Sequence, residues 1–470
     1  MHEAYEQQRI EWINRHAYIG WHDLETEHKQ ALEEGRDLSD LENEFARLLN
    51  TPAGDKPLSG ARDGRWLEDA GRLMDRVQEA PLRRDYPYVE PDDLAAIQAA
   101  RPPEPPLKRW DGSRDAFIEH LHGGLLGRIC GCMLGKPVEG WPRHSIEVTA
   151  RATGNWPLAD YLRQPTPEED AVIAAANPKR QLNKAWKGML RGTMDGMVED
   201  DDTNYTVIGF AVVKQYGKGF TPADVATFWA ANVPVLHTYT AERVAYRNLC
   251  MCIAPPRSAV YRNPYREWIG AQIRADYFGY ANPGNPAQAA EWAWRDACIS
   301  HVRNGIYGEM WVAAMLAAAY VETDWVRVIR AGLAQIPARC RLAEDIGAVL
   351  DAWQRRVSYE QVVEMIRTRW NEADRHHWCH TNSNAQIVAA ALLWGEDDYG
   401  KTICRAVMPG FDTDCNGATA GSLWGVMHGA SAIPDKWSGP MKNLLRTGVA
   451  GYHTVSISEL AREMVEVALR

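Results

Sequence analysis

Two short acidic segments hold the residues of this sequence whose types and spacing best suit chemistry. Residues 199–203 read Glu-Asp-Asp-Asp-Thr, and residues 410–417 read Gly-Phe-Asp-Thr-Asp-Cys-Asn-Gly. Each segment is flanked by Gly, Ala, Val and Ile rather than by further charge. Carboxylates at the edge of an apolar interior must be neutralised by protons or by cations. The two segments therefore predict a metal site.

The donors in these segments are hard oxygens without histidine, which favours Mg²⁺, Mn²⁺ or Ca²⁺ over zinc. Asp201, Asp202, Asp412 and Asp414 would balance the charge of two divalent ions. The alternative is that Asp and Thr only cap helices, because carboxylates also suit the positive end of the helix dipole. A cap needs one such residue, whereas the segments hold Asp-Asp-Asp and Asp-Thr-Asp. We prefer the metal interpretation and keep capping as the alternative.

A second group of metal-capable side chains is His-His-Trp-Cys-His at residues 376–380. Only His376 and His380, at helical i, i+4 spacing, can converge on one ion. We interpret these histidines as residues that line a cleft or cap a helix, with a zinc site as the less favoured alternative.

A nucleotide-binding loop has Ser or Thr directly after its lysine. Residues 135–140, Gly-Lys-Pro-Val-Glu-Gly, have Pro in that place. They therefore do not match the nucleotide-triphosphate pattern.

Helices must position the acidic segments, because long Ala/Leu/Val stretches punctuated by Gly and Pro fill the sequence after residue 107. We predict an all-α domain over residues 108–470. One helix should begin near Asp202 or Thr203 and end at about Tyr216, and another should begin near Cys415 or Asn416. Further helices are predicted over Met310–Val321, Val326–Ile336, Leu342–Trp353, Ala385–Trp394 and Ile457–Leu469.

Two of the expected helices carry a glycine at every fourth position. The series are Gly123, Gly127, Gly131, Gly135 and Gly417, Gly421, Gly425, Gly429. Each glycine within a helix costs about 0.5–1 kcal/mol relative to alanine. A period of four keeps the glycines near one face, where they let another backbone approach. We expect both helices to pack closely at the centre of the domain; the alternative is loops with chance spacing.

Residues 1–107 are expected to form an N-terminal helical extension, because Leu24–Asn50 is rich in Glu, Leu and Ala with charges of both signs. Trp12, Trp21 and Trp66 indicate that the extension packs against something. The segment Arg101–Pro106 is too rich in proline to be helical and is expected to be a stiff connector. We therefore place the domain boundary at residue 107.

The composition is typical of a globular protein, with 470 residues, 46% hydrophobic and 24% charged. A net charge of -10 argues against nucleic acid as a partner. No secretion signal opens the chain, and its longest apolar run is too short for a bilayer. We expect a cytoplasmic protein without a membrane partner. The nine cysteines should be reduced thiols, and we interpret the pairs Cys130, Cys132 and Cys250, Cys252 as small buried residues.

The sequence resembles the ADP-ribosylglycohydrolase family, all-α enzymes with a binuclear magnesium site. Three motifs carry the resemblance in the family's order: the glycine-rich helix and Pro-x-Glu of residues 127–140, Asp-Asp-Thr at 201–203, and Gly-x-Asp-Thr-Asp at 410–414. Residues 380–395 also fit, and the resemblance covers about residues 115–435. It implies an ADP-ribosylglycohydrolase-like orthogonal helical domain with an N-terminal helical extension, a less-characterised branch of the family.

The resemblance also implies roles for particular residues. Asp200 and Cys415 take the places of ligand threonines, although cysteine is a poor magnesium ligand. Glu139 and Asp202 would be catalytic. Trp311 stands where relatives often have Arg, which leaves open whether ADP-ribose or a simpler riboside is bound. The implied metal ligands are Asp200, Asp201, Asp202, Asp412, Asp414 and Cys415, and the implied substrate-binding residues are Gly308, Glu309, His380 and Asn384.

We therefore expect a hydrolase with two Mg²⁺ ions, or Mn²⁺, that cleaves a ribosyl or ADP-ribosyl bond by metal-assisted attack of water. The substrate would be an ADP-ribosylated protein side chain or a small nucleoside-like molecule. The alternatives are a catalytically weak protein that binds a ribosyl ligand, and another metal-dependent hydrolase. The aromatic residues of 262–286 either stack on a base or form a packed surface loop. The leaving group, the oligomeric state and the purpose of residues 1–107 are left open.

Overall fold

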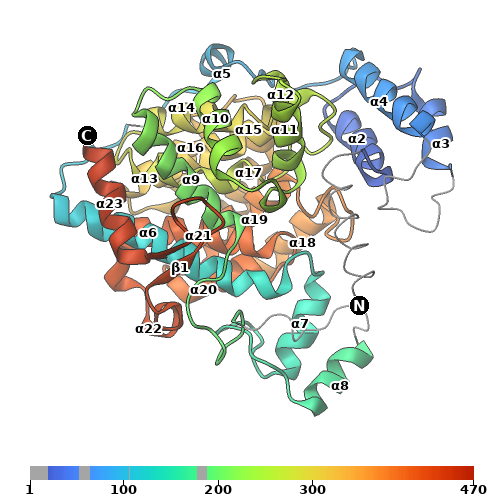
Figure 1. Ribbon diagram of the computed structural model, residues 1–470. Coiled ribbons are helices and arrows are strands. Elements are labelled where there is room, and N and C mark those ends of the chain that lie inside the picture. Colours follow the sequence, from blue (N-terminus) through green and yellow to red (C-terminus); the bar gives the residue numbers. More distant parts are fainter. Residues whose placement is uncertain (1–18, 52–63, 105, 177–187) are drawn as a thin grey trace.

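The computed structural model describes residues 19–51, 64–104, 106–176 and 188–470, and Figure 1 shows that helices dominate them. Trp12 lies outside the described residues. The strands of this part are β1 (Leu444–Arg446) and β2 (Thr454–Ser456), which pair antiparallel. The all-α prediction is confirmed. None of the helices within the described ranges has the length and apolar character needed to cross a bilayer.

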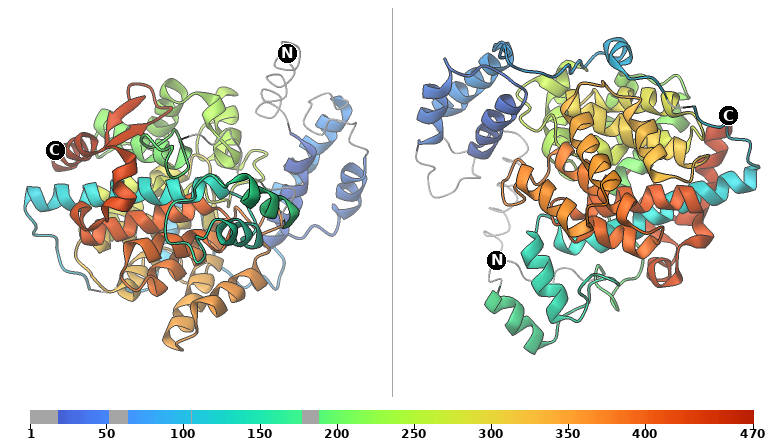
Figure 2. Two further views of the ribbon diagram at one scale, coloured as in Figure 1. Left: turned by 90° about the horizontal axis from the view of Figure 1, so that it is seen from below. Right: turned by 180° about the vertical axis from the view of Figure 1, so that it is seen from behind.

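Three N-terminal helices form a small lobe beside the main body (Figure 2). They are α2 (Trp21–Glu33), α3 (Glu42–Leu49) and α4 (Gly64–Glu79), and they share a core that includes Leu24, Phe45 and Trp66. After them α5 (Leu94–Ala100) packs Ile97 into the main core. The chain then runs over the main body to α6 (Figure 1). Residues 101–104 have no regular structure, as the prolines predicted; the domain boundary at residue 107 stays a prediction.

The main body is a cluster of helices around one continuous core. All five helices that were predicted by their ranges are present. Three begin within one residue of the predicted start, α19 begins four residues earlier than predicted, and α15 begins seven residues earlier. The helices of this body are α6 (Arg114–Gly135), α7 (Arg143–Ala152), α8 (Pro167–Ala176), α9 (Asp201–Tyr216), α10 (Pro222–Asn232), α11 (Thr240–Cys250), α12 (Arg257–Val260), α13 (Asp276–Tyr280), α14 (Pro286–Ala297), α15 (Arg303–Ala319), α16 (Trp325–Leu333), α17 (Arg341–Gln354), α18 (Tyr359–Arg369), α19 (Thr381–Trp394), α20 (Tyr399–Val407), α21 (Thr413–His428), α22 (Asp435–Ser438) and α23 (Ile457–Leu469).

The glycine faces of α6 and α21 pack directly against each other. A Cβ atom added at Gly131 would lie 1.9 Å from the carbonyl oxygen of Gly417, and one at Gly127 would lie 2.2 Å from that of Gly421. Any side chain at these positions would therefore force the two backbones apart. The prediction of two closely packed glycine helices is confirmed, and the alternative of loops is wrong.

Both helices of the acidic segments begin earlier than expected. The N-cap of α9 is Asp200, whose Oδ1 accepts a hydrogen bond of 2.8 Å from the backbone N–H of Asp202. The N-cap of α21 is Asp412, which makes no side-chain cap bond. Several consecutive residues can cap, so the sequence did not fix which one does. Capping therefore accounts for Asp200 and leaves the carboxylate of Asp412 for another role.

Candidate metal centre

The starts of α9 and α21 bring five of the six predicted ligands together. Two sets of side-chain atoms converge, each within 4.8 Å of one another, and Asp414 belongs to both. A shared carboxylate between adjoining sets is suited to two neighbouring cations. The first set is Cys132, Asp200, Asp202 and Asp414, and the second is Asp412, Asp414 and Cys415.

Burial makes these aspartates costly as free anions. Among Asp200, Asp202, Asp412 and Asp414, Asp202 is fully buried and Asp412, the most accessible, is 4% exposed. Burial, together with Asp200, raises the pKa of Asp202 well above its ordinary value, and burial together with Asp414 does the same for the pKa of Asp412. A buried carboxylate either takes up a proton or requires a cation. The cluster therefore favours binding of positive charge.

Two cations of the chain already face the cluster. The Lys136 ammonium contacts Asp200, and Arg128 Nη2 lies 3.2 Å from Asp202 Oδ1 while its Nη1 lies 2.8 Å from Asp276. Although burial alone favours the neutral acid, Lys136 lowers the pKa of Asp200. When ionised, Asp200, Asp202, Asp412 and Asp414 carry four negative charges, and Lys136 and Arg128 balance two of them. Two negative charges are left, even before Asp276 is counted.

The donor set fits a divalent ion best on the side of α21. Within the described part of the chain, Oδ1 of Asp412 and Oδ1 of Asp414 are buried without a hydrogen-bond partner. Oriented hard oxygens of this kind are what Mg²⁺ and Mn²⁺ require. The position beside Asp200 fits less well, because Lys136 already contacts that carboxylate.

Three cysteines line the carboxylates. Cys415 Sγ donates to Asp202 Oδ2 at 3.2 Å, and Cys379 Sγ donates to Asp412 Oδ2 at 3.4 Å. Burial raises the pKa of Cys132, Cys379 and Cys415, which keeps them as neutral thiols. A neutral thiol is a weak ligand for Mg²⁺. Cys415 donates a hydrogen bond in this structure, and its assignment as a metal ligand stays a prediction.

The sequence missed Cys132, Lys136 and Cys379 as members of this centre. One sequence signal could have identified two of them. Cys132 and Lys136 lie one helical turn apart, in the segment that leads to the predicted catalytic residue Glu139. The prediction that the paired cysteines are buried holds for Cys130 and Cys132 and is wrong for Cys250 and Cys252, which are exposed.

Glu139 and Asp201 lie at the outer edge of the centre. Glu139 is exposed and follows the short 3₁₀ helix η1 (Lys136–Val138), and the Asp414 carboxylate raises its pKa well above the ordinary value. Asp201 is half-buried and belongs to neither convergent set. Its assignment as a metal ligand stays a prediction.

The predicted substrate-binding residues are spread over three places. Asn384 Oδ1 accepts from the backbone N–H of Asp412 at 3.1 Å and from Asn416 at 2.8 Å, so it lies at the centre. His380 is buried against Glu33 of the N-terminal lobe. Gly308 and Glu309 are buried within α15, where Glu309 lies 3.6 Å from Arg274. Their roles toward a substrate stay predictions, and only Asn384 contacts a predicted ligand.

The aromatic side chains of residues 262–286 do not form an open wall. Trp268 is 2% exposed and Tyr277, Phe278 and Tyr280 are fully buried. All four belong to the main core, where Tyr277, Phe278 and Tyr280 are part of α13 and Trp268 precedes it. The hypothesis that these residues stack on a base is wrong, and so is the alternative of a surface loop.

The main body is similar in sequence to known proteins. The sequence model of a family described as ADP-ribosylglycohydrolase matches residues 113–469, which begins at the N-cap of α6 and leaves α2–α5 outside. The chain is also similar to a solved structure titled "ADP-ribosylglycohydrolase-related protein complex", with 18% identity, a TM-score of 0.45, and coverage of 75% of this chain and 99% of that chain. That likeness is too distant to support a functional comparison. No curated protein matches the sequence.

Proposed function

The chain belongs to the ADP-ribosylglycohydrolase family, and we propose that it is a magnesium-dependent hydrolase that cleaves a ribosyl or ADP-ribosyl glycosidic bond. The observation that carries the proposal is the pair of adjoining acidic sets that share Asp414. The exposed Glu139, whose pKa is raised by the same Asp414, supports it further.

In this proposal Asp412 and Asp414 would hold one divalent ion, and Asp200, Asp202 and Asp414 would hold a second, weaker one. When bound, such ions supply charge that orients ribose hydroxyls and lowers the pKa of water. Arg128 fixes the Asp202 carboxylate through its hydrogen bond of 3.2 Å. Asn384 fixes the start of α21 through the N–H of Asp412.

Glu139 is the proposed general base. The oxygen of water forms a bond to the anomeric carbon, the bond from that carbon to the leaving group breaks, and its electron pair departs with the leaving group. One proton of the water passes to the Glu139 carboxylate and from there to the leaving group. A raised pKa suits this role, because a base works best when its pKa lies near the working pH.

Trp378 offers a surface for the nucleoside part of a substrate. It is half-buried, and its ring lies 3.8 Å from where a Cβ atom at Gly140 would stand, next to Glu139. Aromatic rings at such positions stack on planar or sugar groups. We propose that the substrate is an ADP-ribosylated protein or a small ribosyl conjugate that packs against this ring.

The test is product analysis with ADP-ribosylated protein, ADP-ribose conjugates and simple ribosides, with and without Mg²⁺. The wild type should release ribose or ADP-ribose only when Mg²⁺ or Mn²⁺ is present. Asp412→Asn should be inactive, whereas the matched control Asp111→Asn, at an exposed position, should retain activity. Chelator-insensitive release of product, or full activity in Asp412→Asn, would contradict the metal mechanism.

A second candidate function is binding of a ribosyl ligand without turnover. It is favoured by Lys136, whose ammonium already contacts Asp200, and by the thiol of Cys415 among the carboxylates. In that case calorimetry would show ADP-ribose binding while product analysis showed no release with any of the substrates.

A further inference from the structure

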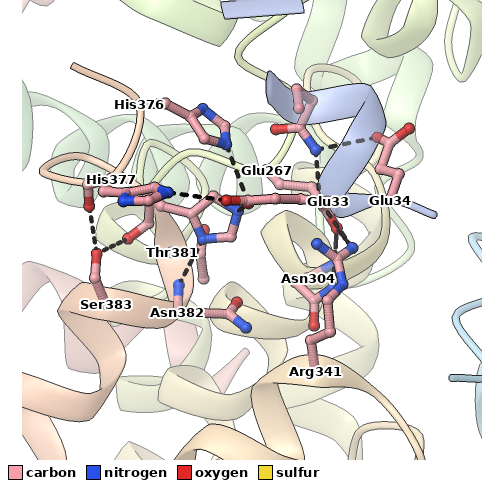
Figure 3. A network of polar contacts seen from close by, with 12 residues as sticks. Glu33, Glu34, Glu267, Asn304, Arg341, His376, His377, Thr381, Asn382 and Ser383 are labelled. Atoms are coloured by element: carbon pink, nitrogen blue, oxygen red, sulfur yellow. Dashed lines mark hydrogen bonds and ion pairs between the residues drawn. The ribbon is translucent and has the colours of Figure 1, made fainter. Parts of the chain in front are cut away.

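Three histidines next to the metal centre point at one carboxylate from the N-terminal lobe. Glu33, the last residue of α2, has its carboxylate oxygens 3.1 Å from His376 Nε2, 3.1 Å from His377 Nε2 and 3.4 Å from His380 Nε2. Figure 3 shows Glu33 reaching from α2 toward His376 and His377. His376 and His380 are fully buried. Glu33 itself is half-buried, so one carboxylate of the lobe is shared by three imidazoles of the main body.

The protonation state of each imidazole follows from what its other nitrogen contacts. His376 Nδ1 accepts from the indole N–H of Trp268 at 2.9 Å. The Nδ1 atoms of His377 and His380 accept from the backbone N–H groups of Asn371 at 3.2 Å and Asn382 at 3.1 Å. A nitrogen that accepts an N–H bond carries no proton, so in the neutral ring the proton lies on Nε2. His376 and His377 thus donate from Nε2–H to Glu33, whereas His380 Nε2 lies 3.4 Å from the same carboxylate without a hydrogen bond.

This arrangement distinguishes a carboxylate site from a zinc site. Glu33, His376 and His380 have ligand atoms close enough to hold a metal ion. Zinc, however, binds the lone pair of Nε2, and Nδ1 must then carry the proton and donate. The indole N–H of Trp268 can only donate, so a proton on His376 Nδ1 would face another N–H at 2.9 Å. The contacts therefore favour an anion in this place.

The rest of α2 docks through charges as well. Arg266 lies 2.6 Å from both Glu27 and Glu34, and Arg243 lies 2.9 Å from Asp23. Buried ion pairs of this kind fix an orientation more than they add net stability. The acidic face of α2 thus has one defined position on the main body, and that position delivers Glu33 to the histidines.

The histidine segment continues directly into the metal centre. His380 is the N-cap of α19, and one turn later Asn384 holds the backbone N–H of Asp412. Between the histidines Cys379 donates to Asp412 Oδ2. A shift of residues 376–380 would therefore move two of the contacts that fix Asp412.

We propose that His376, His377 and His380 form a carboxylate-binding site, that Glu33 is its occupant, and that Glu33 is thereby a positioning residue for the metal ligand Asp412. The first two statements are independent of the proposed function, and the third rests on it. The N-terminal lobe accordingly acts as part of the metal centre rather than as an appended module.

Chemical rescue tests the site in the full-length protein. Glu33→Ala removes the carboxylate and leaves the Nε2–H groups of His376 and His377 without their acceptor, which formate or acetate can replace. We expect a lower melting temperature and about tenfold weaker Mn²⁺ binding. Tenfold is the lower limit of the effect usually seen when a residue that supports a metal ligand is removed. Formate should restore both. Glu25→Ala is the matched control, because it removes the same charge from the same helix, where Glu25 pairs with His22 and Lys29.

The direct readout is ¹⁵N-histidine NMR of the wild type and of Glu33→Gln, which keeps the side-chain size if Glu33→Ala fails to fold. Three rings with Nε2–H in the wild type support the carboxylate site. Nδ1–H at His376, or stoichiometric Zn²⁺ binding that is lost in His376→Ala, would overturn it. Formate rescue of stability without any change in Mn²⁺ affinity would overturn the positioning role alone. None of these measurements depends on turnover, so a wild type without hydrolase activity would count against the proposed function only.

Discussion

Gly131→Ala is the sharpest test of the packing that assembles the metal centre. The new Cβ atom would lie 1.9 Å from the carbonyl oxygen of Gly417, whereas ordinary contact begins at 3.4 Å. The two atoms must therefore separate by 3.4 − 1.9 = 1.5 Å. Both partners are helix backbone, so no side chain can rotate away. The displacement must move α6 against α21, whose first residues include Asp414.

The expected magnitude combines two opposing effects. Overpacking a core costs about 1–3 kcal/mol, and a clash between two backbones places this case at the upper end. Alanine regains about 0.5–1 kcal/mol of helix propensity. The net loss of unfolding free energy is about 2 kcal/mol. With an unfolding entropy of about 2.1 cal/mol/K per residue, a chain of 470 residues should melt about 2 °C lower.

Scanning calorimetry should be combined with Mn²⁺ titration. Gly347→Ala is the matched control, because Gly347 lies within α17 and a Cβ atom there meets nothing within 4 Å. That substitution should raise the unfolding free energy by about 0.5–1 kcal/mol and leave Mn²⁺ affinity unchanged. Gly131→Ala should lower both quantities. If the two variants shift stability in the same direction, the glycine faces do not have the role assigned to them.

Three further predictions concern the charges of the centre. Arg128→Met leaves the buried carboxylates of Asp202 and Asp276 without their cation. The unfolding free energy measured by urea denaturation should fall by about 3–5 kcal/mol. A decrease of less than about 1 kcal/mol would show that these acids are neutral in the native state. Because the pKa values of Asp202 and Asp412 are raised in the folded protein, the metal-free form should lose stability as pH rises above about 4. Melting with EDTA and with Mg²⁺ at several pH values should show stabilisation by Mg²⁺ that grows with pH, and a pH-independent effect would be incompatible with these shifts. Cys415→Ser exchanges a soft donor for a hard one and should tighten Mg²⁺ binding while weakening Cd²⁺ binding in calorimetric titrations; unchanged affinities for both ions would place Cys415 outside the coordination sphere.

Local sequence signals were sufficient for most of the fold. Glycines at every fourth position are costly in a helix unless a backbone covers them, so the pairing of α6 with α21 was predictable. The exact starts of the helices were less predictable, because Asp200, Asp201 and Asp202 can each cap a helix. Lys136 of η1 and Arg128 of α6 contact Asp200 and Asp202, and nothing in the acidic segment itself indicates these contacts.

The centre was predictable only where its residues repeat a pattern. Paired aspartates at two helix starts were sufficient to place Asp202, Asp412 and Asp414 together. Cys132 carries no such pattern, because a cysteine in a glycine-rich helix is most simply a small core residue. Glu309 was assigned to the substrate by resemblance, yet it is buried beside Arg274.

The N-terminal lobe could not be placed from the sequence, since no periodicity relates Glu33 to residues more than three hundred positions later. Four acidic residues of α2 and its C-terminal end face Arg243, Arg266 and the histidines, but each alone is an ordinary surface charge in the sequence. Only the folded arrangement shows that they act as one docking face. The histidine segment was correctly interpreted in one respect, because His380 caps α19.

The buried carboxylates of this protein fall into two groups, those with a side-chain cation beside them and those without one. This difference bears on the proposed metal site. At the docking face the chain supplies its own partners, with Arg266 between Glu27 and Glu34. Even Glu309, whose oxygens lack hydrogen bonds, has Arg274 at 3.6 Å. Asp412 and Asp414 have no side-chain cation within 4.0 Å among the described residues. The chain pairs its other buried acids, and an unpaired buried charge is costly, so Asp412 and Asp414 must be neutralised by protons or by a cation from solution. A divalent cation would meet that requirement with the oxygens already in place.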